Sequence, residues 1–169
     1  MAQSQPFIAY LESLRDDRGA LAALRRGLGR TPGEAREMYP YVVRWLPAEA
    51  SAKREAAYFF VASLFAYHPE PGGSGNLGLG FRRTLEPNGD NTAVERRFTA
   101  LLTAHPDDLP FFLRQAIGFL KSKEVPVDWH QLFVDMLAWG HPSGYVQKQW
   151  ARAFWGRGPD QDKNPSKED

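Results

Sequence analysis

The sequence contains no cysteine, and this absence sets the first limit on its chemistry. The chain therefore has no disulfide and no thiolate ligand for a metal ion, which is typical of an intracellular protein. No window of about 18 residues is apolar and uncharged, as a membrane span requires. The first residues, MAQSQPFIAYLESLRDD, also lack the basic leader and long apolar core of a signal peptide. The sequence predicts a cytoplasmic protein with no membrane contact.

A strong excess of charge is also missing. The 169 residues carry a net charge of +1, and the tail from Asp160 onward has four acids against two lysines, which leaves +3 for residues 1–159. This is far from a histone-like balance, so the free chain should bind nucleic acid weakly and in a salt-sensitive way. With 43% hydrophobic and 13% aromatic residues, the chain can build one domain or two small ones.

The basic residues that are present are mostly arginine. Fifteen of the 21 are arginines, and six of these form the doublets Arg25-Arg26, Arg82-Arg83 and Arg96-Arg97. The guanidinium group is always charged and presents a planar fork of donors that fits phosphate oxygens two at a time. No catalytic cluster lies beside the doublets, so they favour a protein that holds a phosphate backbone. The alternative is that they are ordinary solvated residues on helix surfaces.

Apolar residues recur with helical spacing along nearly the whole chain, and no segment shows the alternation of a strand with hairpin signals. The sequence TPGE at residues 31–34 has the form of a capping box with proline at the first helical position. Asp17 and Asp128 are candidate helix caps. We predict helices over about residues 5–16, 17–27, 31–46 and 50–67, followed by four more that begin near Thr92, Asp108, Asp128 and Ser143.

Residues 69–91 interrupt this pattern. They contain six of the 15 glycines and three of the 13 prolines, which is typical of a long loop or connector. The predicted fold is therefore all-α, with two small helical bundles over residues 1–70 and 92–157. A glycine-rich loop or connector over residues 71–91 joins them, and residues 158–169 form a disordered tail.

Residues 73–78, GSGNLG, match a dinucleotide-binding fingerprint by letter, but that fingerprint needs a preceding strand and a helix precedes it here. Gly75 and Gly80 have P-loop spacing, yet Phe81 stands where the lysine belongs. No nucleophile has a local signature, and no metal or cofactor site is predicted. The sequence does not indicate an enzyme.

The histidines and tryptophans have structural explanations. His68, His105 and His141 each precede a proline at a helix end, where an exposed ring is expected. Five tryptophans could stack on nucleic-acid bases, but four of them lie on apolar helical stripes. We expect the core to contain Trp45, Trp129, Trp139 and Trp150, and the solvent to reach Trp155.

Four stretches, in this order, resemble one family: LAALRRGLGRTPGEA (21–35), LGLGFRRTL (77–85), VERRFTALL (94–102) and FLRQAIGFLKSKEVPVDWHQLFVDMLAW (112–139); the closing VQKQWARAFW (146–155) also fits it. They are similar to the CasB family, the small subunit of the type I-E CRISPR surveillance complex called Cascade. The resemblance covers about residues 10–157, and it is the combination of motifs that is specific.

The resemblance implies a non-enzymatic, all-helical subunit, two copies of which stack head to tail against the guide-binding subunits. Such a subunit helps to hold the guide RNA and the target DNA, and it stabilises the displaced non-target strand of the R-loop. The target sequence is then selected by base pairing elsewhere in the complex. The subunit therefore needs only contacts that depend on the charge and shape of the nucleic acid. The competing hypothesis is a helical adaptor whose basic surface meets acidic protein partners.

The nucleic-acid-binding residues follow from matching the family's motifs position by position. Lys121 is added because it follows Arg114 by seven residues, two turns along the same helix face. For each candidate the alternative is an exposed surface position or an internal pair with Glu34, Glu95 or Asp108. The choice between Arg82 and Arg83 is open, and the predicted set is Arg25, Arg26, Arg82, Arg83, Arg96, Arg97, Arg114 and Lys121.

Overall fold

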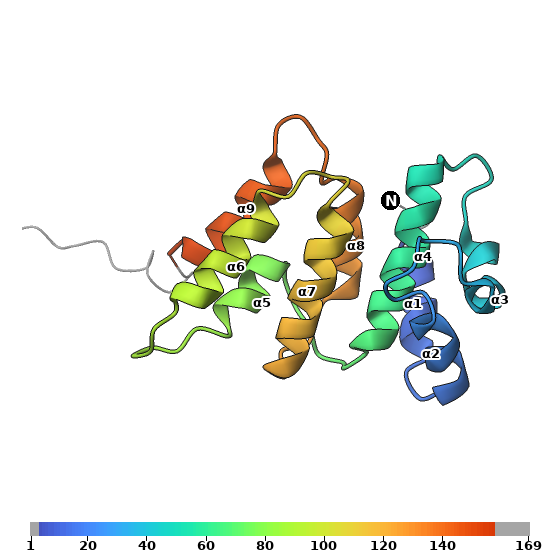
Figure 1. Cartoon of the computed structure of the whole chain (residues 1–169), viewed down its shortest axis with the longest axis horizontal. Coiled ribbons are helices and arrows are strands. Elements are labelled where there is room, and N and C mark those ends of the chain that lie inside the picture. The colour runs from blue at the N-terminus through green and yellow to red at the C-terminus, as the bar shows by residue number, and fades with distance from the viewer. Residues whose placement is uncertain (1–3, 158–169) are drawn as a thin grey trace, which may run out of the picture.

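Helices make up all the regular structure of residues 4–157, the part of the chain that the computed structural model describes (Figure 1). No strand occurs in this part, which confirms the all-α fold class. The α-helices are α1 (Ser4–Ser13), α2 (Arg18–Arg25), α3 (Tyr39–Val42), α4 (Ala52–Tyr67), α5 (Leu77–Arg82), α6 (Thr92–Leu102), α7 (Leu109–Ser122), α8 (Trp129–Leu137) and α9 (Tyr145–Trp155); two 3-10 turns, η1 (Arg36–Met38) and η2 (Val43–Trp45), flank α3.

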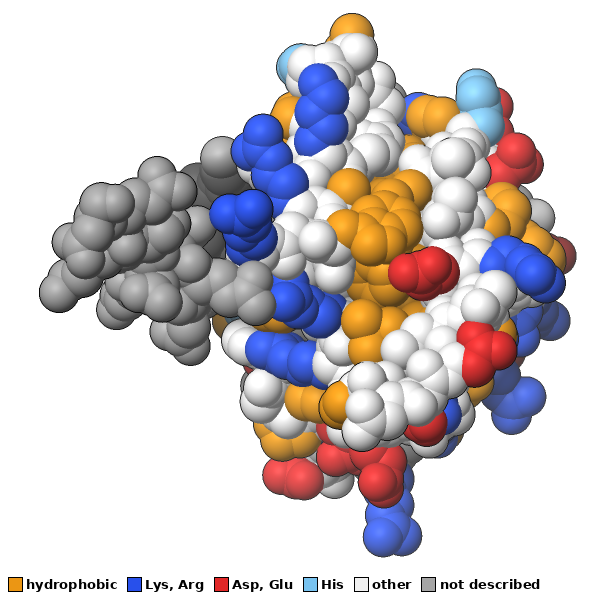
Figure 2. Space-filling view, turned by 90° about the vertical axis from the view of Figure 1, so that its left-hand side faces the viewer, with side chains coloured by type: hydrophobic (Ala, Val, Ile, Leu, Met, Phe, Trp, Pro, Cys, Tyr) orange, Lys and Arg blue, Asp and Glu red, His pale blue; other side chains and the backbone are white. Residues whose placement is uncertain are grey.

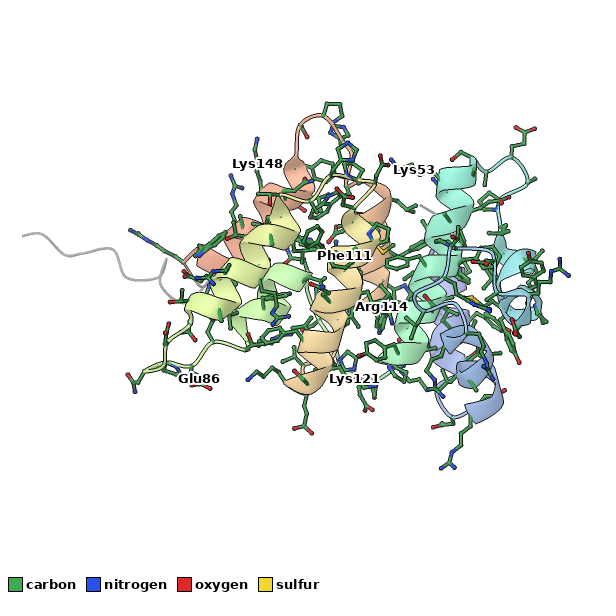
Figure 3. The ribbon with its side chains drawn as sticks, in the orientation of Figure 1. Lys53, Glu86, Phe111, Arg114, Lys121 and Lys148 are labelled. Carbon is green, nitrogen blue, oxygen red and sulfur yellow. The ribbon has the colours of Figure 1, made fainter. Side chains whose placement is uncertain are left out.

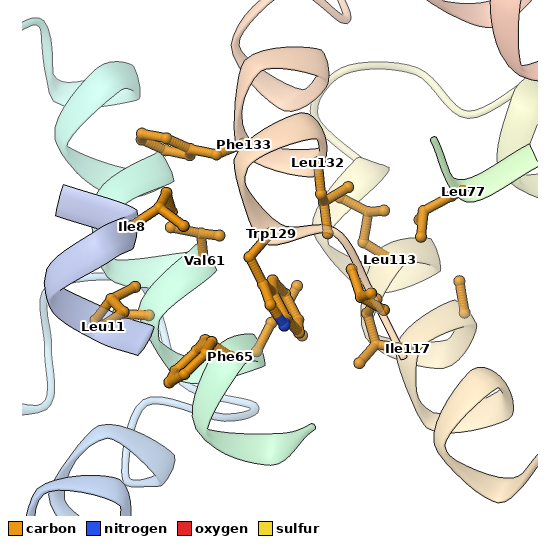
Figure 4. Close-up of a cluster of buried hydrophobic side chains, with 14 of the residues drawn as sticks. Ile8, Leu11, Val61, Phe65, Leu77, Leu113, Ile117, Trp129, Leu132 and Phe133 are labelled. Atoms are coloured by element: carbon orange, nitrogen blue, oxygen red, sulfur yellow. The ribbon is translucent and has the colours of Figure 1, made fainter. Parts of the chain in front are cut away.

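The helices are arranged around one continuous hydrophobic core. Figure 1 shows α1–α4 on one side, α5, α6 and α9 on the other, and α7 and α8 between them. Helix α8 packs against α1 and α4, so Tyr58 lies with its ring centroid 4.9 Å from Phe7 and 5.0 Å from Phe133. Figure 4 shows this core continuing past Trp129 to α7. The buried side chains of residues 1–70 and 92–157 belong to one continuous cluster. The division of the chain into two bundles stays a prediction.

The prediction of a loop over residues 71–91 is wrong where α5 forms. The Asn76 side chain accepts a hydrogen bond from the backbone N–H of Leu79 and so caps the helix, while the ring of Phe81 is fully buried. A Cβ atom at Gly78 would collide with the backbone carbonyl of Trp150 in α9. Glycine here permits close packing of two helices, which is a reason for its presence that a count of glycines does not reveal.

The predicted helix over residues 31–46 is also wrong. Gly33 has a φ of +88°, a left-handed conformation that interrupts a right-handed helix. The backbone N–H of Glu34 bonds to the carbonyl of Thr31, which makes a turn. Short 3-10 and α segments then follow from Arg36, where buried Met38 and Val42 face the core.

Other expectations are confirmed within the described residues. Asp17 caps α2 and Asp128 caps α8 through their side chains. Trp129, Trp139 and Trp150 are buried, the partly buried Trp45 packs against the core, and Trp155 is 50% exposed. The predicted disordered tail, residues 158–169, lies outside the described part. No helix in residues 4–157 is long and apolar enough to cross a membrane.

The expectation for His68 is wrong. Its ring is buried, and Nε2 lies 2.7 Å from the backbone carbonyl oxygen of Val125. This contact joins the end of α4 to the segment between α7 and α8. His105 and His141 are exposed, as expected.

Candidate nucleic-acid interface

The first arginine doublet lies at the end of α2, next to the end of α4. Arg25 is in the last turn of α2, and its Nη1 donates to the backbone carbonyl of Ala66 at 3.4 Å. Arg26 follows as the C-cap residue, with an exposed side chain and no hydrogen bond from its guanidinium to any described residue. One residue of the doublet therefore contacts the neighbouring helix and the other faces solvent.

Arg114 connects this region to α7. Its guanidinium lies against Gly29, which has a φ of +74°, so a Cβ atom at position 29 would collide with Nη1. Lys121, two turns further along α7, places Nζ 4.4 Å from the ring centroid of Tyr67 in α4. Figure 3 shows both side chains of α7 on the side that adjoins α2 and α4. The fold therefore brings the cations of α7 close to those at the end of α2, about 90 residues away in the sequence.

The third doublet lies on α6, which packs against α7. Arg96 and Arg97 are both exposed. The guanidinium carbon of Arg97 lies 4.7 Å from the ring centroid of Phe119 in α7, a cation–π contact that fixes its direction. Arg96 has no such aromatic partner among the described residues, so its donors stay available.

The second doublet has a divided role. Arg82 is half-buried, and its Nη1 donates to the carbonyl of Gly156 at 2.7 Å, at the C-terminal end of α9. Arg83 is exposed, and it donates to the backbone carbonyl and the hydroxyl of Ser74 at 3.1 and 2.9 Å. Arg82 therefore secures the end of a helix, while Arg83 is the one of the pair whose guanidinium faces solvent.

The acids of the described residues do not pair with the cations of the predicted set. Within residues 4–157, basic and acidic side chains meet within 4.0 Å at Arg15–Glu12, His105–Asp107 and His130–Glu12. None of the eight predicted residues is in these pairs, so the alternative of internal pairing with Glu34, Glu95 or Asp108 is wrong for the described structure. No acid among residues 4–157 therefore pairs with them, although Arg25 and Arg82 already donate to backbone carbonyls.

Asp135 is the buried carboxylate of the described residues, and its oxygens bond within the core. Burial raises the pKa of Asp135, against the lowering effect of hydrogen bonds from Trp150 Nε1 at 2.8 Å and Gln131 Nε2 at 2.9 Å. Each carboxylate oxygen already has a protein donor, so the group joins α8 to α9 inside the core. Among the described residues, no three histidine or acidic side chains are grouped to hold a metal ion.

Comparison with known proteins identifies the fold's relatives. The family described as CRISPR-associated protein Cse2 matches residues 20–155. The chain belongs to this family. The CRISPR-associated protein Cse2 of Thermus thermophilus is 33% identical over 169 residues, which is 96% of each chain. The resemblance to the CasB family that the sequence motifs indicated is thereby confirmed.

Solved Cse2-family structures share the arrangement of helices. The crystal structure of CasB from Thermus thermophilus has a TM-score of 0.76 at 31% identity, covering 91% of this chain and 98% of that one. CasB from M. ruber has a TM-score of 0.75 at 28% identity, with 90% and 92% covered. A chain of a structure described as a CRISPR RNA-guided surveillance complex, at 24% identity, shares the fold with a TM-score of 0.76 and coverage of 90% and 91%.

Two more exposed cations of this Cse2-family chain lie outside the predicted set. Lys148 and Arg152 are exposed on α9, one turn apart. Helix α9 lies beside α5 and α6 at the end of the molecule that faces the viewer in Figure 2, where lysine and arginine side chains follow one another down one side of an apolar patch. Both lie in the stretch 146–155 that resembles the family, and their i, i+4 spacing was visible in the sequence, but the predicted set did not include them.

Proposed function

We propose that this chain is the small, non-catalytic subunit of a type I-E CRISPR surveillance complex, in which exposed arginine and lysine side chains hold guide RNA and DNA through phosphate contacts. Other subunits of the complex and a second copy of the chain are its protein partners in this proposal. The observation that carries it is the meeting of α2, α4 and α7, where Arg114 lies against Gly29 and no nearby cation pairs with an acid among residues 4–157.

The chemistry of these side chains supports backbone contacts without sequence selection. Guanidinium groups bind phosphate oxygens in a bidentate way, and such contacts position a strand without reading its bases. In an RNA-guided complex, base pairing with the guide selects the sequence. A subunit with exposed cations is therefore sufficient to help hold the guide–target duplex and the displaced non-target strand.

The modest net charge of +1 is compatible with this role. The field of an assembled complex is the sum over its subunits, so one subunit needs only local cations where the strand passes. The isolated chain should bind single-stranded nucleic acid weakly. With roughly five phosphates contacted, affinity should fall by about tenfold to a thousandfold between 50 and 200 mM salt.

Replacing Arg26, Arg97 and Arg114 together with alanine tests the proposal. The slope of log affinity against log salt for a single-stranded oligonucleotide should become shallower by about 2, since each lost phosphate contact removes roughly 0.7. In the assembled complex the variant should still be incorporated, but target DNA binding should weaken and the displaced strand should close sooner. The unfolding temperature should change little, because exposed arginines contribute little to stability.

A control with the same loss of charge is the triple replacement of Arg18, Arg36 and Lys53, all exposed and outside the predicted set. This variant should keep most of the salt slope and the DNA affinity of the complex. The adaptor hypothesis predicts instead that the first triple variant is absent from the complex, which native mass spectrometry detects directly. Full incorporation with unchanged DNA affinity would refute the phosphate-holding role.

A further inference from the structure

A groove of about 370 Å³ runs between α6 and α7. Its α6 wall has the i, i+3, i+4, i+7 spacing that places four residues on one helix face, and its α7 wall has i, i+3, i+4 spacing. In most packed helices such a face is apolar, but here two of the α6 positions are arginines. The lining residues are Ala93, Arg96, Arg97 and Ala100 of α6 and Phe112, Gln115 and Ala116 of α7.

The groove combines three kinds of group. The guanidinium groups of Arg96 and Arg97 supply positive charge, and no carboxylate of residues 4–157 lines the groove. Phe112 supplies an aromatic ring that is half-buried and packs against the core, and Gln115 is exposed and supplies an amide that both donates and accepts. The three alanines keep the space between the helices open because their side chains end at Cβ.

We infer that this groove receives a single unpaired nucleobase of the bound strand, which stacks on Phe112 while Arg96 or Arg97 contacts the adjoining phosphate. The inference rests on the proposed function and deepens it, because it adds a site for a base to a surface otherwise assigned to phosphates. The ligand class is single-stranded RNA or DNA with at least one base outside a duplex.

The arrangement of charge and ring favours this ligand. Proteins that hold single strands without sequence preference combine a basic groove for the backbone with aromatic rings on which bases stack. Arg97 contacts Phe119, with its guanidinium carbon 4.7 Å from the ring centroid. This contact directs the arginine side chain along α7. The Gln115 amide can bond to the polar edge of any base by presenting either its donor or its acceptor. Such a site recognises a base without selecting which one.

The decisive comparison is between an intact single-stranded oligonucleotide and an abasic one of equal length, measured by fluorescence anisotropy with the full chain at low salt. The two carry the same phosphates, so any difference in affinity comes from the bases. Loss of one stacked base should weaken binding about fivefold or more. In Phe112→Leu, which removes the ring, and in Ala100→Leu, which fills the groove, this difference should disappear while the salt slope stays unchanged.

Thr99→Leu is the matched control for Ala100→Leu, since Thr99 is exposed on α6 and does not line the groove. It should keep the preference for the intact strand, and urea denaturation should show that all three variants fold.

Equal affinity for intact and abasic strands in the wild type would overturn the base site and leave phosphate binding in place. A preference that survives both groove variants would overturn it as well. A salt-independent affinity would instead overturn the proposed function itself. RNA and DNA versions of the strand, compared in parallel, identify which of them supplies the base.

Discussion

Two adjacent arginines, Arg82 and Arg83, should respond in opposite ways to replacement by alanine. Arg82 Nη1 donates to the carbonyl oxygen of Gly156 at 2.7 Å, where the last carbonyls of α9 have no partner within the helix. A second approach, to the carbonyl of Ala153 at 3.4 Å, is too long to add much. Arg83 is exposed and, within the described part of the chain, bonds only to Ser74. We therefore expect Arg82→Ala to destabilise the fold and Arg83→Ala to leave its stability nearly unchanged.

The size of the effect follows from the contact at Gly156. A hydrogen bond from a charged donor contributes about 1.5–3 kcal/mol, and a cation at a helix C-terminus adds about 0.3–1 kcal/mol. Because the Arg82 side chain is half-buried, the lower part of this range applies, and the free energy of unfolding should fall by about 2 kcal/mol. For a chain of this length that corresponds to a loss of roughly 4–8 °C in unfolding temperature. Arg83→Ala should change the free energy by about 0.5 kcal/mol or less.

Urea denaturation followed by circular dichroism measures both variants under the same conditions. Oligonucleotide binding, measured well below the unfolding transition, should show the reverse order, with the larger loss in Arg83→Ala because its guanidinium faces solvent. Equal losses of stability in the two variants, or a larger loss in Arg83→Ala, would refute the assignment of Arg82 to the end of α9.

Two further predictions concern packing and pH. Gly78→Ala should lower the free energy of unfolding by about 1–3 kcal/mol or more, because the new methyl group collides with the backbone of Trp150. Gly80→Ala, in the same helix, places its methyl group at an ordinary 3.5 Å from Leu120 and should be neutral or stabilising by up to about 1 kcal/mol, so equal urea midpoints for the two would contradict the α5–α9 packing. Burial raises the pKa of Asp135 above 3.8, so the folded chain keeps this proton to a higher pH than the unfolded chain. The free energy of unfolding of the wild type should therefore exceed that of Asp135→Asn most strongly below pH 3.8, and the difference should decline as pH rises through the folded pKa. Urea titrations in which this difference grows with pH would contradict the prediction.

Local sequence signals predicted those parts of the fold that depend on neighbours in the chain. Asp17 and Asp128 were recognisable as caps because the bonds they make are to backbone groups three residues away. The helical stripes likewise placed Trp129 and Trp150 in the core. Such features need no knowledge of the tertiary structure.

Features that depend on distant segments were missed. Helix α5 is stabilised by its close approach to α9, about 70 residues away, so its glycines resembled a loop. His68 is buried because Val125 supplies an acceptor for its ring, and no local pattern indicates this. For the candidate interface, the doublets were visible, but only the fold separates Arg82 from Arg83 and places Arg114 against Gly29.

The packing of α8 on α1 and α4 affects how the chain folds during its synthesis on the ribosome. Ile8, Val61 and Phe65 face side chains from α8, as Figure 4 shows, so α1 and α4 cannot cover their apolar surfaces when they first emerge. Residues 68–128 must be translated before Trp129 and Phe133 follow, which takes roughly 3–12 s at ordinary elongation rates. During this interval the nascent chain exposes a surface that suits a chaperone. A message truncated before α8 should therefore yield an insoluble fragment.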